Sequence, residues 1–218
     1  MPVTKVSNPL VKWANESPSV VESPIEKGLR QAAQFLGLGD IEGNLVPTPP
    51  AITMFKDPLT RKVATDVFLD EIRYYTPQYA EAAEKFVSKY PRVAAHMKHS
   101  GKLPPDPDAT ASMMIPVSKD SNVELRINPL LEVSNDPSNT LFHEGTHTAQ
   151  YLGKPNQFRQ LYSDANELVG YYNNPFEINA RRAGDKAMGR SIERYTNALK
   201  QLKDIRADKW LANVPLEK

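Results

Sequence analysis

The chain has 218 residues and contains no cysteine. Disulfide bonds and metal sites built on thiolates are therefore excluded, so any transition-metal site must use histidine or carboxylate ligands. Histidine is also scarce, because the chain has only four. A protein without cysteine fits a reducing compartment.

Long apolar runs and a strong charge of one sign are missing too. Residues 1–30 hold no apolar run of the length that a signal peptide needs, and no stretch approaches a membrane span. The formal net charge is +1, and the basic residues are spread along the chain. This pattern favours neither nucleic acid nor an anionic membrane as a partner. We expect a soluble, cytoplasmic protein.

Proline is abundant, with 19 residues, and it divides the first half of the chain into short elements. We expect residues 1–57 to form an N-terminal appendage and residues 58–218 to form the main domain. In the appendage, Ser23, Pro24 and Glu26 are typical of a helix start with a capping box. The apolar face of this helix comprises Ile25, Leu29, Ala32 and Leu36. Such a face favours docking on the core over binding a separate partner.

Short helices are predicted to open the main domain. After a possible strand at Ala51–Phe55, helical periodicity covers residues 59–75 and 77–90. A further short helix is expected from Pro91 to His99. The apolar residues of the first helix are Val63, Val67, Phe68 and Ile72. His96 and His99 have lysines beside them in the sequence, so we expect both to be solvated.

A hairpin is predicted next, with strands at 112–118 and 122–128 and a turn at 119–121. Val123, Leu125 and Ile127 alternate with polar residues, which is typical of a half-buried strand. A free edge of this sheet could pair with an extended peptide.

The most informative stretch is His143-Glu144-Gly145-Thr146-His147. Residues four apart lie on one face of a helix, so the two imidazoles can point at one zinc ion. Glu144 sits at the edge of that face. Its carboxylate can reach a water on the metal, which is the geometry of a general base. The alternative is an exposed helix with two histidines that bind no metal.

The context supports a helix at this motif. Asp136 is a predicted N-cap and Pro137 opens a helix that runs to about Leu152, so the motif falls in its middle. Gln150 lies on the same side as the histidines. It is a candidate hydrogen-bond partner for one of them, or else an ordinary polar helix residue.

A catalytic zinc site needs a third protein ligand, and here two glutamates compete. Glu167 falls nearly opposite the apolar face of a predicted helix at 157–173. Glu177 lies in the first turn of a helix begun by Asn174 and Pro175. Small residues at Ala180 and Gly184 share its face and indicate close packing, where a carboxylate needs a cation. We therefore favour Glu177, although Glu167 and a pairing of Glu177 with Arg181 stay open.

The pattern H-E-x-x-H-x-x-Q followed by P-x-E-x-x-A resembles the gluzincin-type zincin metallopeptidases, in particular small zincin-like domains of bacteria, phages and mobile elements. The resemblance covers residues 110–190. It implies zinc ligands at His143, His147 and Glu177, a base at Glu144, and an antiparallel edge strand beside the site, which 122–128 would match. A thermolysin-like spacing would instead place the ligand at Glu167.

We expect an α+β, mostly helical zincin-like domain with a short antiparallel sheet, and zinc-dependent hydrolysis of a peptide or protein substrate. Tyr171 and Tyr172 are candidate donors to the oxyanion, and residues 185–212 are predicted to continue a helix. One alternative is a catalytically silent zincin-like module of a particle, virion-associated if the chain is of phage origin. Another is a protease whose N-terminal helix blocks its own cleft.

Overall fold

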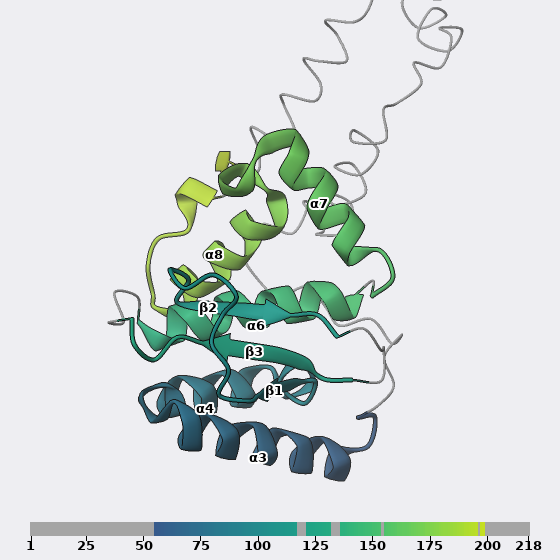
Figure 1. The fold of residues 1–218 in the computed structure, drawn as a ribbon, viewed down its shortest axis with the longest axis vertical. Helices are drawn as coiled ribbons and strands as arrows, with labels where there is room; N and C mark the ends of the chain where they lie inside the picture. The colour runs from purple at the N-terminus through teal and green to yellow at the C-terminus, as the bar shows by residue number, and fades with distance from the viewer. Residues whose placement is uncertain (1–54, 117–120, 132–135, 154, 196, 199–218) are drawn as a thin grey trace, which may run out of the picture.

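The computed structural model describes residues 55–116, 121–131, 136–153, 155–195 and 197–198 (Figure 1). The predicted helix in the appendage, most of the strand at 51–55, most of the hairpin turn and residues 199–212 lie outside this part. The division proposed at residue 57 therefore stays a prediction. Among the described helices, none is both long and apolar enough to cross a membrane.

A three-stranded sheet lies at the centre, in the order β1-β3-β2. β2 (Ala111–Met114) pairs antiparallel with β3 (Val123–Ile127), with Met113 opposite Leu125, so the predicted strand pair is confirmed. β1 (Met97–His99) pairs parallel with β3. The sheet is thus mixed, not purely antiparallel.

Two predictions about these strands are wrong. The helix expected from Pro91 to His99 ends early, as α5 (Pro91–Ala94), and the chain then forms β1. Three residues are too few for a periodic signal, and β1 is instead fixed by its pairing with β3. The expected edge strand, 122–128, is β3, which is central because β1 covers its other side. The free edge next to the motif helix belongs to β2.

Helices lie beside both outer strands. α3 (Pro58–Tyr75) contacts β1, and α6 (Pro137–Gly153) contacts β2, so these two helices lie toward opposite edges of the sheet (Figure 1). The 3-10 turn η1 (Pro77–Tyr79) and α4 (Ala80–Lys89) complete the α3 layer. One apolar core joins the layers through Phe68, Ile72, Phe86, Leu125, Leu141 and Phe142.

The apolar face of α3 differs from the prediction. Phe68 and Ile72 are buried, but Val63 and Val67 are 55% and 52% exposed. At about 100° per residue, positions 63 and 68 are about 140° apart around the helix, so one core cannot cover both pairs. The core takes the larger residues.

The last described helices pack above α6. A second apolar cluster, which includes Phe158, Leu161 and Phe176, joins α7 (Phe158–Val169) to α8 (Pro175–Ala187), and η2 (Tyr171–Asn173) connects these helices in the chain. The helix predicted to continue over 185–212 is interrupted, because α8 ends at Ala187 and Gly189 adopts φ +69°. A left-handed residue ends the helical hydrogen-bond pattern.

His96 and His99 are buried, so the prediction that they are solvated is wrong. Nδ1 of His99 lies 3.0 Å from the carbonyl oxygen of Leu125, and the His96 ring packs edge-on against Phe55. Burial lowers the pKa of both imidazoles, to about 4 for His96. Both rings are therefore neutral parts of the core at neutral pH.

This burial predicts a loss of stability in mild acid. A histidine whose pKa is lower in the folded state favours folding fully above its unfolded pKa near 6.5, and this contribution is lost as the pH falls toward 4. Between pH 7 and 4.5 we expect His96 alone to cost the wild type on the order of 2–3 kcal/mol. Urea unfolding at several pH values measures it. His96→Phe should flatten the pH dependence and Lys98→Gln should not; equal slopes in wild type and His96→Phe would contradict the expectation.

Candidate metal centre

α6 presents the histidines of the motif. Its start is the predicted one: the Asp136 carboxylate accepts the backbone N–H of Ser138 at 2.7 Å, and Pro137 is the first helical residue. The helix is buried along most of its length. A Cβ added to Gly145 would overlap the Phe86 ring, so α6 packs closely on α4 at the middle of the motif. This contact fixes the helix that carries His143 and His147.

α8 brings the glutamate to them. The Asn174 side chain accepts the N–H of Phe176 at 3.0 Å and Pro175 opens the helix, as predicted. A Cβ added to Gly184 would lie 2.8 Å from the carbonyl oxygen of Asn139, so α8 and α6 approach closely. The predicted close-packed face is confirmed. Glu177 in the first turn is buried in this interface.

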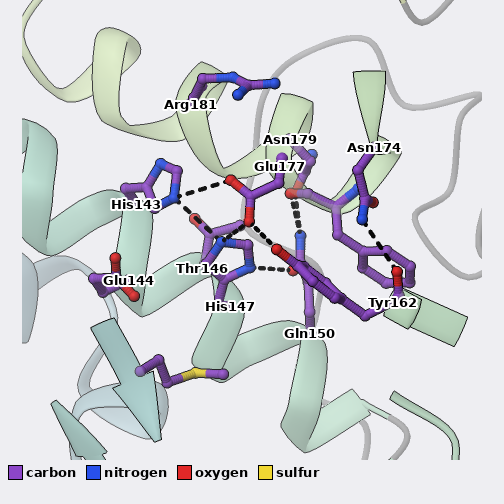
Figure 2. Close-up of polar contacts among 12 residues, drawn as sticks. His143, Glu144, Thr146, His147, Gln150, Tyr162, Asn174, Glu177, Asn179 and Arg181 are labelled. Carbon is purple, nitrogen blue, oxygen red and sulfur yellow. Dashed lines mark hydrogen bonds and ion pairs between the residues drawn. The ribbon is translucent and has the colours of Figure 1, made fainter. Parts of the chain in front are cut away.

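His143, His147 and Glu177 converge on one point from α6 and α8 (Figure 2). Nε2 of His147 lies 3.1 Å from Oε1 of Glu177, and Nε2 of His143 lies 3.5 Å from Oε2. The two Nε2 atoms are 3.2 Å apart. Ligands at ~2.0–2.1 Å from a tetrahedral zinc lie about 3.3–3.4 Å from one another. Each of the three separations is close to this length, with one carboxylate oxygen of Glu177 facing each imidazole.

Gln150 fixes the protonation of His147. Its amide nitrogen donates to the carbonyl oxygen of Phe176 and to Asn179, each at 3.2 Å. A carbonyl oxygen only accepts, so the amide oxygen of Gln150 faces the other way, 2.9 Å from Nδ1 of His147. Nδ1 must therefore carry the proton and donate it. The other nitrogen, Nε2, is left with its lone pair directed at the Glu177 carboxylate.

Two lone pairs facing each other at this distance need a cation or a proton between them. Burial of the His147 imidazole disfavours its charged form, but the charge of Glu177 outweighs burial and raises the pKa of His147 to about 9. Burial likewise raises the pKa of the Glu177 carboxyl, yet the two imidazoles lower it well below its usual range. Oε2 of Glu177 is buried without a hydrogen-bond partner among the described residues. The donor set thus suits a cation.

Loss of the Gln150 contact should weaken metal binding without removing a ligand. Partners of a metal-bound histidine typically contribute about 10- to 100-fold to metal affinity, because they fix its tautomer and ring orientation. Gln150→Met is expected to lower zinc affinity by that factor, measured by competition with a chromophoric chelator. Gln160→Ala, which removes an exposed amide from α7, is the control. Unchanged affinity in Gln150→Met would show that His147 does not depend on this contact.

Tyr162 is a site residue that the sequence interpretation missed. Its hydroxyl donates to Oε1 of Glu177 at 2.5 Å, and its ring packs edge-on against His147. The ring also contacts Phe158 one helical turn earlier. That i, i+4 aromatic pair on the predicted helix was the one available signal. The Tyr162 hydroxyl and Nε2 of His147 thus meet the same oxygen of Glu177, and this hydrogen bond orients the carboxylate.

The competing candidates separate clearly in the structure. Glu167 is exposed on α7 and is not one of the three residues that converge. Arg181 donates to the backbone oxygen of Tyr172, and the pairing considered for Glu177 is absent from the contacts of the described residues. Among the described residues, only His143, His147 and Glu177 form a group with metal-ligand spacing.

Glu144 is buried but lies outside this group. In Figure 2 its side chain stands apart from the network that joins the histidines, Gln150 and Glu177. Its negative charge nevertheless acts on His147, where it contributes to the raised pKa. The carboxylate is thus near the centre without being part of the convergent set.

Comparisons with protein-family models, with curated proteins and with solved structures found no match for this chain.

Proposed function

We propose that this chain is a zinc-dependent peptidase with His143, His147 and Glu177 as ligands. The observation that carries the proposal is the convergence of these side chains at spacings that fit one tetrahedral ion. Two imidazoles and one carboxylate are a donor set typical of catalytic zinc, which keeps its fourth position for water or substrate. When bound, zinc would polarise the scissile carbonyl and make water more acidic.

Glu144 is the proposed general base. It follows the first histidine on α6, is buried, and does not belong to the convergent group. Its carboxylate would accept a proton from the attacking water and return it to the leaving amine. A buried carboxylate without a partner cation among the described contacts costs folding free energy, and catalytic sites are where such a cost is often retained. An assembly module would not need this residue.

Tyr171 is the better of the two proposed oxyanion donors. Burial, and then the negative charge of Glu177, raise the pKa of its phenol, so the hydroxyl stays protonated at neutral pH and can donate. Tyr172 is 79% exposed. The phenol of Tyr171 is therefore the group that we assign to the developing negative charge.

The free edge of β2 offers a way to hold an extended substrate. β2 pairs only with β3 within the described sheet, and it lies against α6, where the Thr148 hydroxyl contacts the sulfur of Met113 at 3.3 Å. A peptide added to that edge would run beside the motif helix. Backbone pairing of this kind accepts many sequences, so selectivity must come from side-chain contacts.

Cleavage of a peptide library tests the proposal. Zinc-loaded protein is incubated with peptides derived from a whole proteome, and new termini are identified by mass spectrometry. We expect cleavage that a zinc chelator abolishes and added zinc restores. If the protein holds zinc yet cleaves nothing, the peptidase proposal fails and a zinc-stabilised assembly module takes its place.

A further inference from the structure

Three residues form a partly exposed cluster beside the candidate metal centre: Arg181 on α8, and Tyr171 and Tyr172 in η2. Arg181 lies one helical turn after Glu177, on the same face of α8. Its Nη2 donates to the backbone oxygen of Tyr172. The guanidinium carbon lies 5.9 Å from the ring centroid of each tyrosine. The two rings therefore hold the guanidinium group in place.

The charge of Arg181 is not neutralised in the described part of the chain, where no carboxylate within ion-pair distance of it is found. A guanidinium group has five N–H donors, and its described bond to Tyr172 uses one of them. The tyrosines beside it are 50% and 79% exposed. Arginine and tyrosine are enriched at binding surfaces. Rigid rings beside an arginine hold its guanidinium group in place, so that binding costs little side-chain entropy.

The cluster adjoins the proposed catalytic groups through Tyr171. Burial and then the negative charge of Glu177 raise the pKa of the Tyr171 phenol, and the positive charge of Arg181 acts in the opposite direction. The Tyr171 side chain thus lies within electrostatic range of both Glu177, the proposed ligand, and Arg181. A substrate held at the centre would have its neighbouring groups within reach of Arg181.

We propose that Arg181, framed by Tyr171 and Tyr172, binds a carboxylate of the substrate, so that the enzyme selects peptides with a negative group near the scissile bond. This inference rests on the proposed function. Guanidinium and carboxylate are planar and form two parallel hydrogen bonds, a match that lysine does not offer. The carboxylate is either the C-terminal one or an aspartate or glutamate side chain. The first makes the enzyme an exopeptidase of C-termini, and the second makes it selective for acidic sequences.

The retention of peptides on the protein measures the preference for a carboxylate without any cleavage. Zinc-loaded Glu144→Gln protein is immobilised and exposed to three matched pools of hexapeptides. The first pool has neutral side chains and a free C-terminal carboxylate. The second has an amidated C-terminus and one glutamate, and the third has an amidated C-terminus and no acidic residue. We expect one of the first two pools to be retained at least about tenfold better than the third, because a hydrogen bond to a charged group contributes about 10- to 100-fold. Preference for the free C-terminus identifies the C-terminal source, and preference for glutamate identifies the side-chain source.

Second-site variants in the same protein assign the effect to Arg181. Adding Arg181→Gln should remove the preference, and Arg181→Lys should restore only part of it. Arg92→Gln, which removes an exposed arginine from α5, should leave it intact. Equal retention of the three pools, or a preference that survives Arg181→Gln, overturns the proposal.

The wild type is assayed for zinc content and for cleavage in parallel. Absence of zinc or of cleavage contradicts the peptidase itself. A wild type that holds zinc and cleaves peptides, but whose selection ignores carboxylates, contradicts only the assignment of Arg181.

Discussion

Glu144→Gln is expected to lower the turnover of any peptide that the wild type cleaves by about 10²- to 10⁴-fold. The amide cannot accept the proton that the proposed base must take from water. Glu144 lies outside the three convergent residues, so zinc content should equal that of the wild type. The substitution preserves shape, and the melting temperature should change little. Turnover is measured on the best substrate from the peptide library, with zinc quantified in the same samples.

Glu167→Gln provides the matched control for this variant. It makes the same chemical change at an exposed position on α7, and we expect turnover to stay at the wild-type level. Full activity in Glu144→Gln would show that Glu144 is not the base, even with zinc bound. Loss of zinc from Glu144→Gln would indicate that Glu144 is itself a zinc ligand, which would contradict the proposed set of three ligands.

Glu177→Gln should weaken zinc binding by more than about 100-fold, beyond the 10- to 100-fold typical of outer partners of a ligand. It removes the charged ligand while keeping the volume of a side chain that is buried between α6 and α8. The remaining histidines would offer two donors, one fewer than a catalytic zinc site takes from the protein. Competition with a chromophoric chelator gives the affinity.

Glu167→Gln again serves as the control, because sequence spacing alone left it as the rival ligand. Its exposure on α7 predicts wild-type affinity. The reverse pattern, with zinc lost in Glu167→Gln and kept in Glu177→Gln, would move the site to a thermolysin-like arrangement. Loss of zinc in both variants would indicate that folding, not ligation, is affected, and circular dichroism would show it.

Local chemistry made the main features of the centre predictable. Asp136 and Asn174 cap α6 and α8 where the sequence indicated, because an N-cap is recognised within a few residues. The placing of Glu177 depended on the small residue at Gly184, and that position does meet α6 closely. The choice between two glutamates thus followed from helix faces, which are a property of one segment.

The sequence did not predict the features that depend on contacts between segments far apart in the chain. His99 is buried because Leu125 and Tyr75 close around it, and neither lies near it in the sequence. β1 exists because β3 accepts it as a parallel partner. Tyr162 reaches Glu177 only because α7 folds back over α8. No periodicity in the local sequence carries such information, since parallel pairing and side-chain networks join residues far apart in the chain.

The zinc content of the purified protein, measured by mass spectrometry, tests the central claim most directly. After exposure to zinc and removal of the excess, we expect about one zinc ion per chain in the wild type, and almost none in folded His143→Ala or His147→Ala. Lys98→Gln should keep the wild-type content. A wild type without zinc, or full zinc occupancy in both histidine variants, would contradict a metal centre at His143, His147 and Glu177.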